Sequence, residues 1–86
     1  MKTYRFIAYF KGVDYMSEDM AEALYEAGCD DCLPGSSDGE AYAYFDREAE
    51  RFEEAVASVI ANVKTAGYEV QRVQINESDL AELTTE

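Results

Sequence analysis

The sequence of 86 residues predicts an α+β protein with a ferredoxin-like βαββαβ order, in which two helices cover one face of a four-stranded antiparallel sheet. Three observations predict this fold. Aromatic and branched residues alternate at period two near both ends of the chain, apolar residues recur at helical spacing in two segments between them, and a turn-rich stretch divides the middle. Each βαβ half crosses over right-handed, so both helices should cover the same face and leave the other face open.

The first strand and the first helix have clear sequence signals. The segment TYRFIAYF, residues 3–10, alternates between two sets of apolar side chains and predicts a strand. Ser17 is a favourable N-cap, and the acidic residues that follow it suit the positive end of a helix dipole. Gly28 is a typical C-terminal stop, which predicts a helix over residues 18–27.

The middle of the chain predicts a hairpin and the second helix. A weak strand is expected at residues 31–33, a turn at residues 34–39, and a second strand at EAYAYF, residues 40–45. Asp46 is expected to cap the second helix, which Gly67 ends. The apolar stripe of that helix comprises Phe52, Val56, Val59, Ile60 and Val63.

YEVQRVQI, residues 68–75, predicts the last strand, so one domain spans residues 1–76. A polar tail follows over residues 77–86, with one helical turn that Ser78 caps. The alternation assigns seven residues to the helix-covered face of the sheet and three tyrosines to the open face. The first set is Phe6, Ala8, Phe10, Ala43, Phe45, Val73 and Ile75, and the second is Tyr9, Tyr42 and Tyr44.

The charge balance restricts the classes of partner. The chain carries 19 acidic and 7 basic residues and no histidine, for a net charge of −12. Residues 14–54 alone hold 14 acidic and two basic residues, so the whole excess lies in the middle of the sequence. This field repels nucleic acids and acidic membranes and attracts basic proteins. The sequence has no apolar run of the roughly 20 residues that span a bilayer and no signal-peptide pattern, which predicts a cytoplasmic protein.

Three segments resemble the N-terminal domain of small bacterial helix-turn-helix proteins. They are ALYEAGCDD, FDREAERFEEAVASVIANVKTAG and EVQRVQI, and the resemblance covers about residues 3–80. The resemblance implies a ferredoxin-like domain. In that family the DNA-reading helix-turn-helix follows a segment similar to ESDLAELTTE, where this sequence ends, so the DNA binding of the family is not expected here. In size, charge and expected fold the chain is also similar to phage anti-CRISPR proteins.

Cys29 and Cys32, in GCDDCLPG, raise the question of a redox or metal site. Zinc needs about four ligands, and two cysteines without histidine cannot supply them. A reactive thiol needs cations or a helix N-terminus nearby, whereas Asp30 and Asp31 separate this pair beyond a helix C-terminus. We therefore expect two structural cysteines, no metal and no cofactor. Without a nucleophile–base pair or a phosphate-binding loop, we also expect no enzymatic activity.

Acidic residues provide the main candidate site. Glu18, Glu22 and Glu26 are spaced i, i+4 and i+8 along the first predicted helix, without a lysine or arginine among them. Such a row of carboxylates can imitate DNA phosphates, which predicts an inhibitor that occupies a basic nucleic-acid-binding protein, for example a subunit of a CRISPR effector. The expected partner-binding residues are Glu18, Asp19, Glu22, Glu26, Asp30 and Asp31, followed by Glu48, Glu50, Glu53 and Glu54. A solvated helix face without a partner is the simpler alternative.

The open sheet face offers a second hypothesis. Tyr9, Tyr42 and Tyr44 could form a protein-interaction or homodimerisation surface, because tyrosine is enriched at such interfaces. Aromatic residues on an open sheet also occur in RNA-binding domains, but the basic residues that would contact phosphates are missing here. The two hypotheses differ in their response to salt, since the attraction between exposed charges is screened and apolar contact is not.

Overall fold

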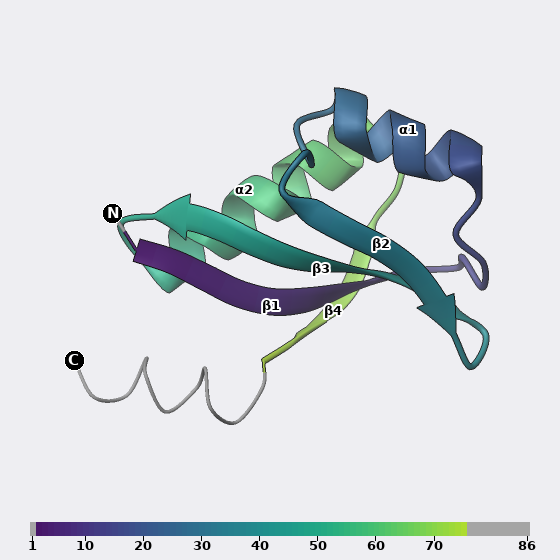
Figure 1. The fold of residues 1–86 in the computed structure, drawn as a ribbon, viewed down its shortest axis with the longest axis horizontal. Coiled ribbons are helices and arrows are strands. Elements are labelled where there is room, and N and C mark those ends of the chain that lie inside the picture. Colours follow the sequence, from purple (N-terminus) through teal and green to yellow (C-terminus); the bar gives the residue numbers. More distant parts are fainter. Residues whose placement is uncertain (1, 76–86) are drawn as a thin grey trace.

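The structure is a computed structural model that describes residues 2–75, and it confirms the predicted α+β fold (Figure 1). The elements are β1 (Lys2–Phe10), α1 (Glu18–Glu26), β2 (Cys32–Ser37), β3 (Glu40–Ala49), α2 (Phe52–Thr65) and β4 (Val70–Gln74). The expected tail over residues 77–86, with its turn capped by Ser78, lies outside the described residues.

The four strands form one antiparallel sheet in the order β2-β3-β1-β4. The central pair is long, because β1 and β3 remain in register from Lys2 opposite Ala49 to Tyr9 opposite Tyr42. Both helices lie on the same side of this sheet, and no other helix or strand of residues 2–75 covers the opposite side (Figure 1). This order and layering are those of the ferredoxin-like fold.

The core lies between the sheet and the helices and confirms the predicted alternation. Phe6 stacks on Phe45 at 5.7 Å between ring centroids, and Phe52 of α2 meets Phe6 edge-on at 5.8 Å. Large aromatic rings thus join the two central strands to α2. All seven residues assigned to the helix-covered face belong to this core or pack against it; they are Phe6, Ala8, Phe10, Ala43, Phe45, Val73 and Ile75.

The ends of α1 agree with the sequence signals. The Ser17 side chain accepts a hydrogen bond of 3.1 Å from the backbone N–H of Met20, which satisfies one of the free donors of the first turn. Gly28 follows the helix with φ 113°, a conformation that favours glycine. The helix therefore begins and ends where local chemistry predicts.

The hairpin differs from the prediction. The expected turn at residues 34–39 is wrong, because β2 continues to Ser37, and only Asp38 and Gly39 connect it to β3. Both connecting residues have positive φ, 52° and 75°, as in the two-residue turns that match the twist of paired strands. Pro34 is tolerated within the strand because β2 lies at the edge of the sheet.

The start of the second helix also differs from the prediction. Asp46 does not cap it: β3 continues past Asp46 to Ala49, because β1 offers a backbone partner along this whole length. The carboxylate of Asp46 instead pairs with Arg5 at 3.2 Å. Residue Arg51 occupies the N-cap of α2 without a side-chain capping bond, and Ile60, expected in the apolar stripe, is exposed.

Candidate functional site

The acidic row predicted on the first helix is present on α1. Glu18, Glu22 and Glu26 are exposed, and so are the neighbouring Asp19 and Asp30. Within residues 2–75 no basic side chain pairs with any of these five carboxylates. The structure therefore presents five of the six first-choice residues to solvent with their charges uncompensated.

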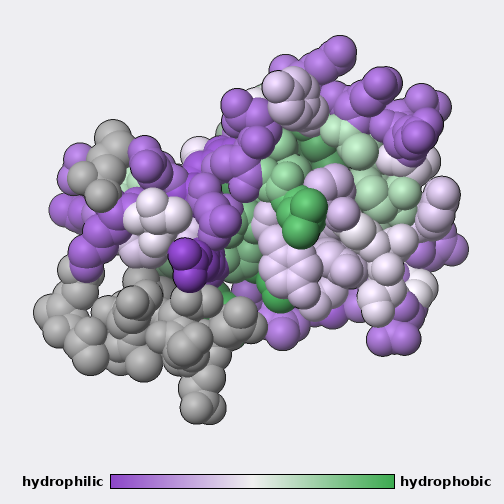
Figure 2. All heavy atoms as spheres, viewed as in Figure 1, coloured by the Kyte–Doolittle hydropathy of each residue, from purple (hydrophilic) through white to green (hydrophobic). Residues whose placement is uncertain are grey.

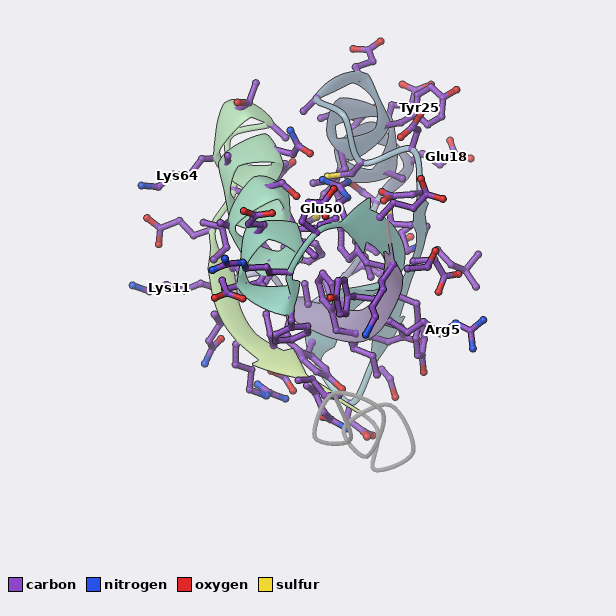
Figure 3. All side chains as sticks on the ribbon, turned by 90° about the vertical axis from the view of Figure 1, so that its left-hand side faces the viewer. Arg5, Lys11, Glu18, Tyr25, Glu50 and Lys64 are labelled. Carbon is purple, nitrogen blue, oxygen red and sulfur yellow. The ribbon has the colours of Figure 1, made fainter. Side chains whose placement is uncertain are left out.

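Two of the basic residues project away from the acidic row. Figure 3 shows Glu18 and Tyr25 on one side of the molecule and Lys11 and Lys64 on the opposite side. Arg5 projects on the same side as Glu18, but it pairs with Asp46. Lys11 lies 3.8 Å from Glu69, and Lys64 occupies the last turn of α2, where it suits the negative end of the helix dipole. This separation leaves the α1 side of the molecule strongly negative.

Asp31, the sixth first-choice residue, has a different environment. Its carboxylate receives two hydrogen bonds from Arg47, at 2.7 Å from Nε and 2.6 Å from Nη2. The same guanidinium donates to Ser58, to Asn62 and to the carbonyl oxygen of Gly28. All five N–H donors of the guanidinium are thus used, and only 11% of the Arg47 side chain is exposed. Asp31 contributes to a structural network that joins α1, β3 and α2.

The second group of predicted acidic residues does not form a common row. Glu48 lies on β3, Glu50 lies in the connection after it, and only Glu53 and Glu54 lie in the first turn of α2. The sequence predicted that all four glutamates belong to the second helix, because no local pattern of residues indicates that β3 continues to Ala49. These four carboxylates are exposed and come from different elements. Glu48 lines a surface hollow together with Asp30 and Asp31.

Cys29 and Cys32 lie beneath the acidic row as two free thiols. Cys29 is 1% exposed, and the Cys32 thiol donates a hydrogen bond of 3.1 Å to the Cys29 carbonyl oxygen. Burial raises the pKa of Cys29 more than the charge of Arg47 lowers it, and burial raises the pKa of Cys32 to about 11. Both groups are therefore neutral at physiological pH, and neither has the low pKa of a reactive thiolate.

A groove separates α1 from the edge strand β2. Its volume is about 440 Å³. It is lined by Ala21, Glu22, Tyr25, Glu26, Cys29, Cys32 and Pro34. In Figure 2 hydrophobic side chains lie between α1 and β2, below the hydrophilic side chains of α1. Tyr25 lines this groove and is 65% exposed. It was not among the predicted site residues, because only the charged residues of this helix were taken as a signal of binding.

The open face of the sheet carries the predicted tyrosines in contact with one another. Tyr9 lies opposite Tyr42 across the strands at 6.0 Å between centroids, and Tyr42 meets Tyr44 edge-on at 5.4 Å. Leu33 lies directly opposite Tyr44 on the neighbouring strand and is 69% exposed, whereas Tyr44 is 47% exposed. Leu33 was expected in a weak strand over residues 31–33, which was too short to show an alternation that would assign it to a face.

Arg72 also lies on the open face. Its guanidinium is 3.9 Å from the centroid of Tyr9 and forms two hydrogen bonds to the Glu40 carboxylate, at 2.6 and 2.8 Å. The bond to Arg72 lowers the pKa of Glu40. The Arg72 cation beside Tyr9 is thus held by an intramolecular ion pair.

Within residues 2–75 no group of three or more cysteine, aspartate or glutamate side chains is arranged to hold a metal ion. No helix in this part of the chain is long and apolar enough to cross a membrane. The chain matches no protein-family model, no curated protein and no solved structure.

Proposed function

We propose that this protein is a non-enzymatic inhibitor or regulator that occupies a basic, nucleic-acid-binding surface of a partner protein. The observation that carries the proposal is the exposed row of Glu18, Glu22 and Glu26, which no cation compensates within residues 2–75. Like charges at i, i+4 destabilise a helix by roughly 0.2–0.5 kcal/mol per pair. A binding role gives a reason for keeping this unfavourable arrangement.

The spacing of the row supports phosphate mimicry. Residues four apart on a helix differ in axial position by about 6 Å, since each residue rises about 1.5 Å. This length is close to two nucleotide steps along one DNA strand, about 6.8 Å at 3.4 Å per step. Carboxylates on a rigid helix can therefore contact several arginine or lysine side chains that normally contact every second phosphate along a strand.

One concrete form of this function is an anti-CRISPR protein whose partner is a nucleic-acid-binding subunit of a CRISPR effector. Such a protein would be phage-encoded and would act in the host cytoplasm. The chemistry does not depend on this choice, because any basic groove that binds nucleic acid would attract the same surface.

Affinity capture from a bacterial lysate with immobilised protein tests the proposal, when washed at low and at high salt. We expect the retained proteins to be nucleic-acid-binding and to be released both by high salt and by added duplex DNA. The variant Glu18→Gln, Glu22→Gln, Glu26→Gln should lose them. The control Asp14→Asn, Asp38→Asn, Glu69→Gln removes the same charge at exposed positions outside the proposed binding residues and should retain them. Equal capture by both variants would contradict the proposal.

The open sheet face supports a second candidate function, a protein-interaction or homodimerisation domain. The specific observation is the exposed pair of Leu33 and Tyr44 beside the contacting rings of Tyr9 and Tyr42. Contact through this surface should persist at high salt, because it buries apolar area. Sedimentation of the wild type and of Tyr42→Ser, Tyr44→Ser at high salt tests it. A monomeric wild type would exclude the homodimer.

A further inference from the structure

We propose that the groove between α1 and β2 receives an arginine side chain of the basic partner, held between the ring of Tyr25 and the carboxylates of Glu22 and Glu26. This inference rests on the proposed function and names the chemical group that its site recognises. Three features of the groove support it, and each is independent of the total charge of the protein.

The first feature is the shape and polarity of the groove. The groove has a volume of about 440 Å³, and Ala21, Cys29, Cys32 and Pro34 form the wall beside its acidic residues. The two thiols at this wall are protonated at physiological pH, as their raised pKa values require. A neutral, largely apolar wall suits the methylene stem of a long basic side chain, whose charged end remains at the polar rim.

The second feature is the rim. Glu22 and Glu26 line the groove one helical turn apart, and neither pairs with a basic side chain within residues 2–75. Tyr25 also lines the groove and is 65% exposed. An exposed aromatic ring beside unpaired carboxylates is an arrangement that attracts a cation through both the ring face and the charge.

The third feature is how the protein holds two of its four arginines. Arg72 lies 3.9 Å from the centroid of Tyr9 and pairs with Glu40. Arg47 lies 5.6 Å from the centroid of Phe45 and pairs with Asp31.

Each of these two guanidinium groups therefore meets one aromatic ring and one carboxylate. Tyr25 with Glu22 and Glu26 forms a third set of this kind, and no arginine within residues 2–75 occupies it. Arginine fits better than lysine, because its planar guanidinium can stack on the ring while it donates two parallel bonds to a carboxylate.

Titration with an oligoarginine peptide and an oligolysine peptide of equal length and charge tests the inference, followed by calorimetry and by amide NMR spectra. We expect the wild type to bind the arginine peptide about 3–10-fold more tightly, which is the factor expected for one exposed cation–π contact with bidentate pairing. The largest shifts of amide signals should occur at Ala21, Tyr25 and Cys32. Equal affinity for both peptides, or shifts confined to other surfaces, would overturn the inference.

Two variants and a control separate this inference from the proposed function. Tyr25→Leu keeps apolar volume but removes the ring. The ratio of the affinities for the arginine peptide and the lysine peptide should therefore fall towards one, while both peptides still bind. Tyr15→Leu, at another exposed tyrosine, should keep the preference.

If Tyr25→Leu keeps the full preference for the arginine peptide, the groove inference fails. The proposed function still stands if the variant Glu18→Gln, Glu22→Gln, Glu26→Gln binds both peptides more weakly than the wild type does. If that triple variant binds both peptides as the wild type does, or if the wild type binds neither at millimolar concentration, the proposed function fails and the groove inference fails with it.

Discussion

The guanidinium of Arg47 and the carboxylate of Asp31 form a bidentate ion pair, with N–O distances of 2.7 and 2.6 Å, that joins β3 to the segment between α1 and β2. The pair compensates the charge of Asp31, although 28% of the Asp31 side chain remains exposed. It also fixes the end of α1 relative to the sheet, because the same guanidinium donates to the Gly28 carbonyl oxygen. The position of the acidic row thus depends on an arginine that is not part of it.

Arg47→Met should lower the free energy of unfolding by about 2–3 kcal/mol, because Asp31, Asn62 and Gly28 each lose a donor in a largely buried site. Urea denaturation followed by circular dichroism measures this loss. Arg51→Met is the control, since Arg51 is exposed, and should change stability by less than about 0.5 kcal/mol. A stable Arg47→Met variant would show that the network contributes little.

Gly35→Ala should destabilise the protein by roughly 1 kcal/mol, because the added Cβ would lie 2.8 Å from the hydroxyl oxygen of Tyr42 and displace its ring. The same substitution in a Tyr42→Ser background should cost nothing, since the ring is gone. A double-mutant cycle in urea measures this coupling. An equal loss in both backgrounds would mean that the backbone, and not the ring, requires glycine at this position.

The cysteines predict a pH dependence of stability. The folded state raises the pKa of Cys32 to about 11, above the ordinary value of about 8.5 for an unfolded thiol. The unfolded chain therefore loses this proton first, and the stabilisation that is complete below pH 8.5 should decline as the pH rises towards 11. Cys32→Ala should show a smaller decline than the wild type in urea titrations over this range. Parallel curves would contradict the assigned shift.

The variant Glu18→Gln, Glu22→Gln, Glu26→Gln should fold as well as the wild type and gain roughly 0.2–0.5 kcal/mol for each of its two relieved i, i+4 repulsions. Thermal unfolding at low salt measures the gain, and added salt should reduce it by screening the wild-type charges. A loss of stability would mean that these glutamates have a structural role, and binding data from this variant would then need a different control.

The isolated protein should not bind duplex DNA or RNA at physiological salt, because the electrostatic attraction that supplies non-specific affinity has the wrong sign at a net charge of −12. A gel shift with a labelled duplex tests this. Micromolar binding would contradict the proposed phosphate mimicry and would indicate that the rings of Tyr9, Tyr42 and Tyr44 stack on bases.

Local chemistry in the sequence was sufficient for the elements whose signals are short-range. Alternation in β1 assigned Phe6 and Phe10 to the core and Tyr9 to the open face, because neighbouring side chains of a strand point to opposite sides. Ser17 and Gly28 located the ends of α1, since capping depends on residues next to the helix terminus. The exposed row of Glu18, Glu22 and Glu26 followed from helical periodicity in the same way.

The tertiary structure alone decided those features that depend on contacts between residues far apart in the sequence. The length of β3 is set by the backbone groups that β1 offers as far as Ala49, and a strand ends where its partner ends, so Asp46 and Glu48 lie on the sheet instead of starting a helix. Asp31 and Arg47 meet because the fold brings the end of α1 against β3. The groove at Tyr25 exists only where α1 packs beside β2, a contact that no local pattern of residues encodes.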